Sequence, residues 1–141
     1  MEPLKIGDLP DQALLLRDSA PIIYFLENHP DFEPLFRPLF EAHAVGRVRF
    51  AVTTITIAEI LTGPLRAADE ALARRYRATL ESWQVVGLDA DIAVSAARLR
   101  ASLRLKLPDA IQAASALAIN ADALVTCDRD FSRVHSMRII S

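Results

Sequence analysis

The sequence has little cysteine and no long apolar run, and both absences restrict where the chain can work. Its single cysteine, Cys127, excludes an internal disulfide and any zinc site built from several cysteines, and it fits a reducing compartment. The apolar runs fall far short of the ~20 residues that a membrane-spanning helix needs. The first residues, MEPLKIGDLPDQ, lack the basic and apolar regions of a signal peptide. We therefore expect a cytoplasmic protein without membrane association.

Lysine is also scarce, with two lysines against fourteen arginines. The formal net charge is −2, so the chain as a whole lacks the strong positive charge typical of nucleic-acid-binding proteins. Arginine binds phosphate bidentately and stacks on bases, which leaves RNA and DNA open as partners. A genomic bias towards arginine and alanine codons would produce the same ratio.

Composition and length predict one globular domain over residues 1–141. The chain is 52% apolar and only 6% aromatic, so its core should be aliphatic. A chain of 141 residues can bury a single core of that kind without a second domain. Residues 1–11 are polar and carry two prolines, and we expect them to be a loosely held lead-in.

Strand-like and helix-like segments alternate along the rest of the chain. We expect strands at residues 13–16, 48–53, 84–88, 123–126 and 138–140. We expect helices at residues 19–28, 32–44, 54–61, 65–82, 89–103 and 108–120, and a helical turn at 130–134. Gly63-Pro64 is predicted to end the third of these helices. Short, wholly apolar strands separated by helices indicate an α/β fold, with a parallel sheet covered on both faces.

Acidic residues follow the expected strands or begin the next helices. In open parallel sheets ligands bind beyond the carboxyl ends of the strands, so these positions are candidates for a site. The acids at such positions are Asp18, Glu59, Asp109, Asp128 and Asp130. Each one alone also has a structural explanation, as a helix cap, a favourable charge on a helix dipole or a solvated helix face.

Glu59 is the most informative of these acids. It is the only charged residue in TTITIAEILTG, which is unusual for a solvated helix face and suggests a buried or half-buried carboxylate. Carboxylates crowded together repel each other unless a cation lies among them. Because the histidines lie on expected surface segments and cysteine is almost absent, oxygen ligands for Mg²⁺ or Mn²⁺ are favoured over a zinc site.

Four stretches together resemble a known family. In order and spacing, DSAPIIYFLE, TITIAEILTGP, LPDAIQAASAL and ALVTCDRDF are similar to the acidic motifs of PIN-domain ribonucleases, in particular the VapC-type toxins of bacterial toxin–antitoxin pairs. The resemblance implies that Asp18, Glu59, Asp109 and Asp128 bind the metal and carry catalysis. It also implies that Ser19 and Thr126 hydrogen-bond to those carboxylates, and that Asp130 could assist a second ion.

The same resemblance implies a fold, a reaction and partners. The fold would be a five-stranded parallel sheet in the order 3-2-1-4-5. The reaction would be Mg²⁺- or Mn²⁺-dependent hydrolysis of RNA, leaving a 5′-phosphate and a 3′-hydroxyl. The expected partners are an antitoxin and a second copy of the chain. Candidate surfaces for them are the helix at 65–82 and the run Phe32, Leu35, Phe36, Leu39 and Phe40, a run that could equally be core.

Binding RNA beside an acidic pocket also requires basic side chains. The candidates for phosphate contact are Arg17, Arg66, Arg129 and Arg133. Arg17 and Cys127 depart from the usual family pattern, which has an apolar and a polar residue at these positions. Because side chains alternate along a strand, Arg17 should point away from Asp18.

Two other functions stay open at this point. One is a non-catalytic interaction module that keeps the fold without the cleavage, against which the intact acidic quartet argues. The other is an aspartate-based phosphoacceptor or phosphohydrolase, since DRD after a strand imitates a D-x-D motif. Enzymes of that second kind usually need a lysine near the crevice, and only Lys106 could serve.

Overall fold

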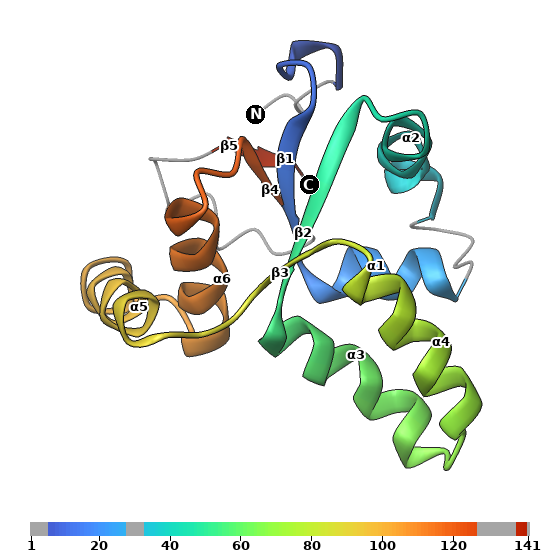
Figure 1. Cartoon of the computed structure of the whole chain (residues 1–141). Helices are drawn as coiled ribbons and strands as arrows, with labels where there is room; N and C mark the ends of the chain where they lie inside the picture. Colours follow the sequence, from blue (N-terminus) through green and yellow to red (C-terminus); the bar gives the residue numbers. More distant parts are fainter. Residues whose placement is uncertain (1–5, 28–32, 127–137, 141) are drawn as a thin grey trace.

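A five-stranded parallel sheet forms the centre of the molecule (Figure 1). The computed structural model describes residues 6–27, 33–126 and 138–140. The strands are β1 (Ala13–Arg17), β2 (Val48–Thr53), β3 (Gln84–Val86), β4 (Ala123–Val125) and β5 (Arg138–Ile140). Their order is β3-β2-β1-β4-β5, and every neighbouring pair is parallel. The expected α/β fold and strand order are confirmed.

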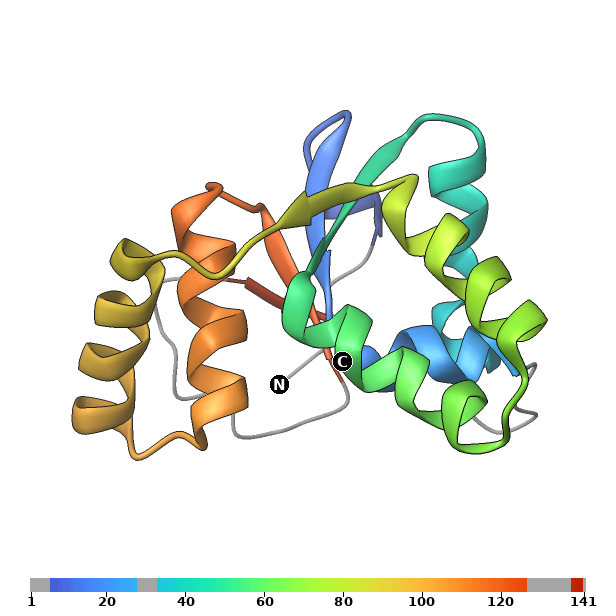
Figure 2. The same cartoon turned by 60° about the horizontal axis from the view of Figure 1, so that its bottom comes forward.

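Helices cover both faces of this sheet. One layer holds α1 (Ser19–Leu26), α2 (Glu33–Ala44), α3 (Thr54–Arg66) and α4 (Glu70–Glu81), and the other holds α5 (Ala90–Leu103) and α6 (Leu107–Ala118). Figures 1 and 2 show the α5 and α6 pair on one side of the sheet and the other four helices on the opposite side. Each side has its own cluster of buried apolar residues. In the part of the chain that the structure describes, no helix is long and apolar enough to cross a membrane.

The alternation of side chains along β1 explains why its sequence is apolar throughout. Leu15 belongs to the core beneath α1 to α4, while Leu14 and Leu16 belong to the core beneath α5 and α6. All five residues of the strand are buried. By the same alternation, Arg17 and Asp18 fall on opposite faces of the sheet.

The expectation of a loose lead-in over residues 1–11 is wrong for residues 6–11. A short 3₁₀ turn, η1 (Ile6–Asp8), precedes Leu9, whose side chain is buried in the core. The guanidinium group of Arg47 donates to the backbone oxygens of Leu9 and Pro10, at 2.8 and 2.7 Å. These contacts hold the segment against the start of β2, while residues 1–5 lie outside the described residues.

The predicted helix end at Gly63-Pro64 is also wrong, because α3 continues to Arg66. The helix ends instead where Ala68 takes a left-handed conformation with φ of 55°. The N–H groups of Ala68 and Asp69 then donate to the oxygens of Leu65 and Pro64, at 3.1 and 2.9 Å, which is a Schellman motif. Proline removes only one helical hydrogen bond, and Pro64 is buried in the last turn, so the helix accommodates it.

The predicted helix at 65–82 is therefore split by this turn. Its observed part is α4, which begins at Glu70 and ends at Glu81. The carboxylate of Asp69 caps α4 by accepting the N–H of Leu72 at 3.0 Å. The other expected elements are present within a few residues of their predicted bounds, apart from the helical turn at 130–134, which lies outside the described residues.

Candidate functional site

Asp18 lies at the carboxyl end of β1, directly beside β4. Its backbone N–H donates to the oxygen of Val125 at 2.9 Å, so the pairing of the two strands continues to this residue. Oδ1 of Asp18 accepts from the N–H of Ser19 at 2.9 Å, and Oδ2 accepts from the hydroxyl of Thr126 at 2.9 Å. The carboxylate is half-buried and held from both sides at the point where the strand order reverses.

Gln112 is the third residue that contacts this carboxylate. It lies in α6, is almost fully buried, and donates from Nε2 to Oδ1 of Asp18 at 3.2 Å. The same amide bonds to the hydroxyl of Thr53, which caps α3, and to that of Thr56 in the first turn of the helix. Our sequence reasoning missed Gln112, although a lone polar amide in the run AIQAAS is as unusual as Glu59 in its own apolar run.

Glu59 faces the same region from α3. The hydroxyl of Ser19 donates to Oε2 of Glu59 at 3.5 Å, which is a long hydrogen bond. Partial burial and the nearby charge of Asp18 raise the pKa of Glu59 above its ordinary value, and the Ser19 hydroxyl opposes that shift. Glu59 is more exposed than the buried or half-buried carboxylate expected from the sequence, because α3 lies at the surface and withdraws only part of the side chain from water.

Asp109 lies in the first turn of α6, where a negative charge is favourable to the helix dipole. It is half-buried and precedes Gln112 by three residues, so both lie on one face of the helix. Asp128 and Asp130 lie outside the described residues. Within the described ranges, no three side chains of the metal-binding types form a group around one point, so three members of the expected quartet do not complete a metal site by themselves.

The donor set of these acids suits a hard divalent cation. Asp18, Glu59 and Asp109 offer carboxylate oxygens; they follow β1 or lie in α3 and α6, and the hydrogen bonds of Gln112 connect these elements. The charge of Asp18 is, after burial, the second cause that raises the pKa of Glu59. A cation between the two carboxylates would relieve that repulsion.

The prediction that Arg17 contacts RNA phosphate is wrong. Its side chain is fully buried, and its guanidinium carbon lies 4.2 Å from the ring centre of Phe40 and 4.5 Å from that of Phe50. As expected, it points away from Asp18, into the core beneath α2. Arg66 is exposed at the end of α3, where a phosphate can reach it, while Arg129 and Arg133 lie outside the described residues.

The described part of the aromatic run expected in α2 belongs to the core and not to a free surface. Leu39 is buried, and Phe40 packs its ring edge on Phe50 at 5.3 Å between ring centres. Trp83 completes the group. Phe32, Leu35 and Phe36 lie outside the side chains that the structure describes.

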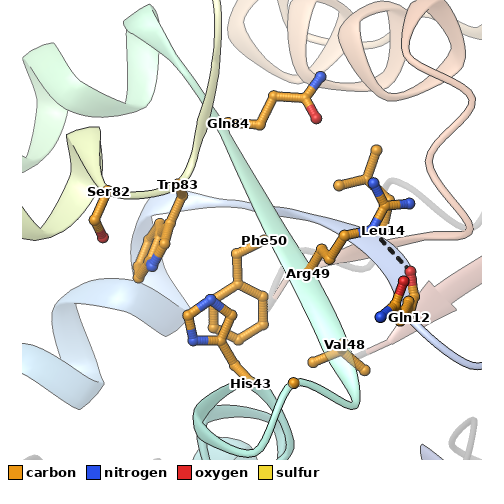
Figure 3. A pocket seen from close by; sticks show the side chains of 10 residues that line it. Gln12, Leu14, His43, Val48, Arg49, Phe50, Ser82, Trp83 and Gln84 are labelled. Atoms are coloured by element: carbon orange, nitrogen blue, oxygen red, sulfur yellow. Dashed lines mark hydrogen bonds between the residues drawn. The ribbon is translucent and has the colours of Figure 1, made fainter.

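A separate pocket of about 410 Å³ opens at the other end of the sheet (Figure 3). It lies at the amino ends of β1, β2 and β3, and its walls include His43, Arg49 and Trp83. Arg49 donates from Nε to the backbone oxygen of Gln12 at 2.9 Å. None of the described residues that line this pocket carries a carboxylate, in contrast to the acidic end of the sheet.

The family model for the PIN domain matches residues 16–136, which is most of the chain. The chain belongs to the PIN-domain family. The resemblance seen in the sequence is thereby confirmed, and the matched residues include all four positions of the expected acidic quartet. Comparison with curated protein sequences finds no match.

Solved structures of VapC-type toxin–antitoxin proteins share this fold. A toxin–antitoxin complex from Klebsiella pneumoniae is 24% identical, with a TM-score of 0.71 over 90% of this chain and 96% of that chain. A VapBC family member, VapBC-5 from Mycobacterium tuberculosis, is 28% identical, with a TM-score of 0.59 over 91% and 98%. VapC20 from the same organism, described as a sarcin-ricin loop cleaving toxin, is 16% identical, with a TM-score of 0.69 over 86% and 95%.

Proposed function

We propose that this PIN-domain protein is a Mg²⁺- or Mn²⁺-dependent endoribonuclease and the toxin of a toxin–antitoxin pair. The observation that carries the proposal is Asp18, an aspartate held by three hydrogen bonds at the carboxyl edge of the sheet, whose charge adds to partial burial in raising the pKa of Glu59. Membership of the PIN family and the neighbouring toxin structures support the same activity.

The four acids would share one role, which is to bind the metal. Asp18, Glu59, Asp109 and Asp128 would hold the metal, which when bound supplies an activated water and neutralises charge on the leaving oxygen. With the metal bound, hydrolysis would add the water oxygen to phosphorus and break the bond from phosphorus to the 3′ oxygen. One proton of that water would pass to the 3′ oxygen, so the products would carry a 5′-phosphate and a 3′-hydroxyl. Ser19 and Thr126 keep the carboxylate of Asp18 in one orientation throughout.

Basic side chains around the acidic edge would bind the RNA backbone. Arg66 is exposed at the end of the helix that carries Glu59, and we propose it as a phosphate contact together with Arg129 and Arg133. The substrate would be a single-stranded loop, because unpaired bases can be read by sequence.

The toxin–antitoxin structures similar to this chain suggest its protein partners. We propose that an antitoxin covers the acidic edge of the sheet and silences the enzyme, and that the chain works as a homodimer. Purification from an expressed toxin–antitoxin pair, followed by removal of the antitoxin under denaturing conditions, provides the active protein for an assay.

The proposed reaction is tested by incubating this protein with total RNA and Mn²⁺ and mapping the new ends. We expect a few defined cleavage sites with 5′-phosphate ends, and none when EDTA replaces the metal. Intact RNA would favour the non-catalytic module. A phosphoprotein formed with acetyl phosphate would favour the phosphoacceptor.

A further inference from the structure

The side chain of Gln112 contacts both Asp18 and the start of α3. We propose that it is a positioning residue for RNA cleavage, which leaves Oδ2 of Asp18 as the oxygen that binds the metal. The inference rests on the proposed function and deepens it. It comes from three hydrogen bonds of one buried amide, and the carboxylate that this amide holds is the central acid of the site.

The orientation of the amide is fixed by its partners. The hydroxyl of Thr53 accepts the N–H of Thr56 at 3.1 Å, so its hydrogen is free to point at Oε1 of Gln112, 3.0 Å away. The carboxylate of Asp18 can only accept, so it requires the NH₂ side of the amide. A flipped amide would place two acceptor oxygens together at Asp18. The hydrogen-bond network therefore allows one orientation.

The two carboxylate oxygens of Asp18 also differ in the number of hydrogen bonds that they accept. Oδ1 accepts from the N–H of Ser19 at 2.9 Å and from Gln112 at 3.2 Å, which uses both of its lone pairs. Among the residues that the structure describes, Oδ2 accepts only from Thr126. Within those residues one lone pair of Oδ2 remains for a cation, and Gln112 would direct the metal there by occupying Oδ1.

The same amide joins the three elements that carry the described acids. It lies on α6 one turn after Asp109, bonds to Asp18 at the end of β1, and bonds to both Thr53 and Thr56 at the start of α3. Glu59 follows Thr56 by three residues on that helix, and thus on the same face. A shift of Gln112 would move all three acids relative to one another.

Gln112→Met tests this role, because methionine has a similar size and can form none of the three bonds. We expect the Kd of the metal-free protein for Mn²⁺, measured by calorimetry, to rise by about 10-fold or more, which is the usual effect of losing a partner of a metal ligand. kcat for RNA cleavage should fall by a similar factor, while KM for RNA stays within about 2-fold. Ser115→Ala is the matched control, since Ser115 is buried one turn later on α6, and it should leave both quantities unchanged.

A folded Gln112→Met protein with the Mn²⁺ affinity and kcat of the parent would overturn the proposal. If this variant does not fold, Thr56→Val decides, because it frees one side of the amide while Asp18 and Gln112 stay in place. It should weaken Mn²⁺ binding by a few-fold, and unchanged binding would overturn the proposal. A parent that binds Mn²⁺ but cleaves no RNA refutes the proposed function alone, since the affinity measurement still tests Gln112. A parent that binds no Mn²⁺ overturns both.

Discussion

Ser19 donates its hydroxyl to Glu59 across forty residues of sequence, at 3.5 Å between Oγ and Oε2. The backbone N–H of the same serine donates to Oδ1 of Asp18, so one residue contacts two acids from different elements. Partial burial and, after it, the nearby charge of Asp18 raise the pKa of Glu59, so the two carboxylates lie within reach of each other's charge.

Glu59→Gln should stabilise the metal-free protein at pH 7. The pKa of Glu59 is raised in the folded state, so the ionised carboxylate opposes folding above that pKa, and the penalty disappears below the pKa of the unfolded chain. Because the side chain is exposed, we expect a gain of less than about 1 kcal/mol in the free energy of unfolding. Urea unfolding in EDTA at pH 7 and at pH 4 measures it, with the gain smaller at the lower pH.

The control repeats the stability measurement of Glu59→Gln in a protein that also carries Asp18→Asn. Without the charge of Asp18, Glu59→Gln should stabilise the protein less than it does in the parent. An equal gain in both backgrounds would show that the two carboxylates do not interact. A loss of stability at pH 7 would contradict the raised pKa itself.

Arg66 and Arg17 should differ in their effect on RNA binding. Replacing a phosphate contact lowers the slope of log K against log salt by about 0.7 for single-stranded RNA. We expect this change for Arg66→Ala and no change for Arg17→Met, because Arg17 is fully buried against the rings of Phe40 and Phe50. Fluorescence anisotropy in EDTA, over a salt series, measures binding without cleavage. Arg98→Ala on α5 is the control and should leave the slope unchanged. An unchanged slope for Arg66→Ala would mean that Arg66 does not contact RNA phosphate.

Ala68→Gly should raise the free energy of unfolding by about 0.5–1 kcal/mol, because Ala68 has φ of 55° in the turn that ends α3. Ala78→Gly, at an exposed position inside α4, should instead cost about 1 kcal/mol. Chemical unfolding of the parent, Ala68→Gly and Ala78→Gly measures the free energy of unfolding of each. Equal destabilisation by both glycines would mean that α3 does not end in this left-handed turn.

The sequence predicted the alternation of strands and helices well, because strands buried on both faces are apolar throughout. The strand order came from the family resemblance and not from the pattern, since no periodicity encodes which strands are neighbours. The predicted end of α3 was wrong because Gly63-Pro64 is a strong local stop signal. Burial of Pro64 in the last turn overrides that signal.

The acids of the site could be predicted from the sequence, but the partners of Gln112 could not. Acids at strand ends stand out in an apolar chain, so Asp18 and Glu59 could be found. Gln112 could not be assigned a partner from sequence, because its contacts with Asp18 and Thr56 span 94 and 56 residues. Arg17 was misjudged for the opposite reason: a lone arginine suggests a phosphate contact, while its burial against Phe40 and Phe50 depends on tertiary packing.

The central claim is that Asp18 binds the metal on which RNA cleavage depends. The most direct test compares RNA cleavage by the parent, Asp18→Asn and Asp91→Asn in Mn²⁺, where Asp91 is an exposed acid in the first turn of α5. We expect Asp18→Asn to lose about 100-fold or more of kcat while it stays folded, since losing a ligand costs at least as much as losing a ligand's partner. Asp91→Asn should match the parent. Cleavage by Asp18→Asn at the parent's rate would contradict the account.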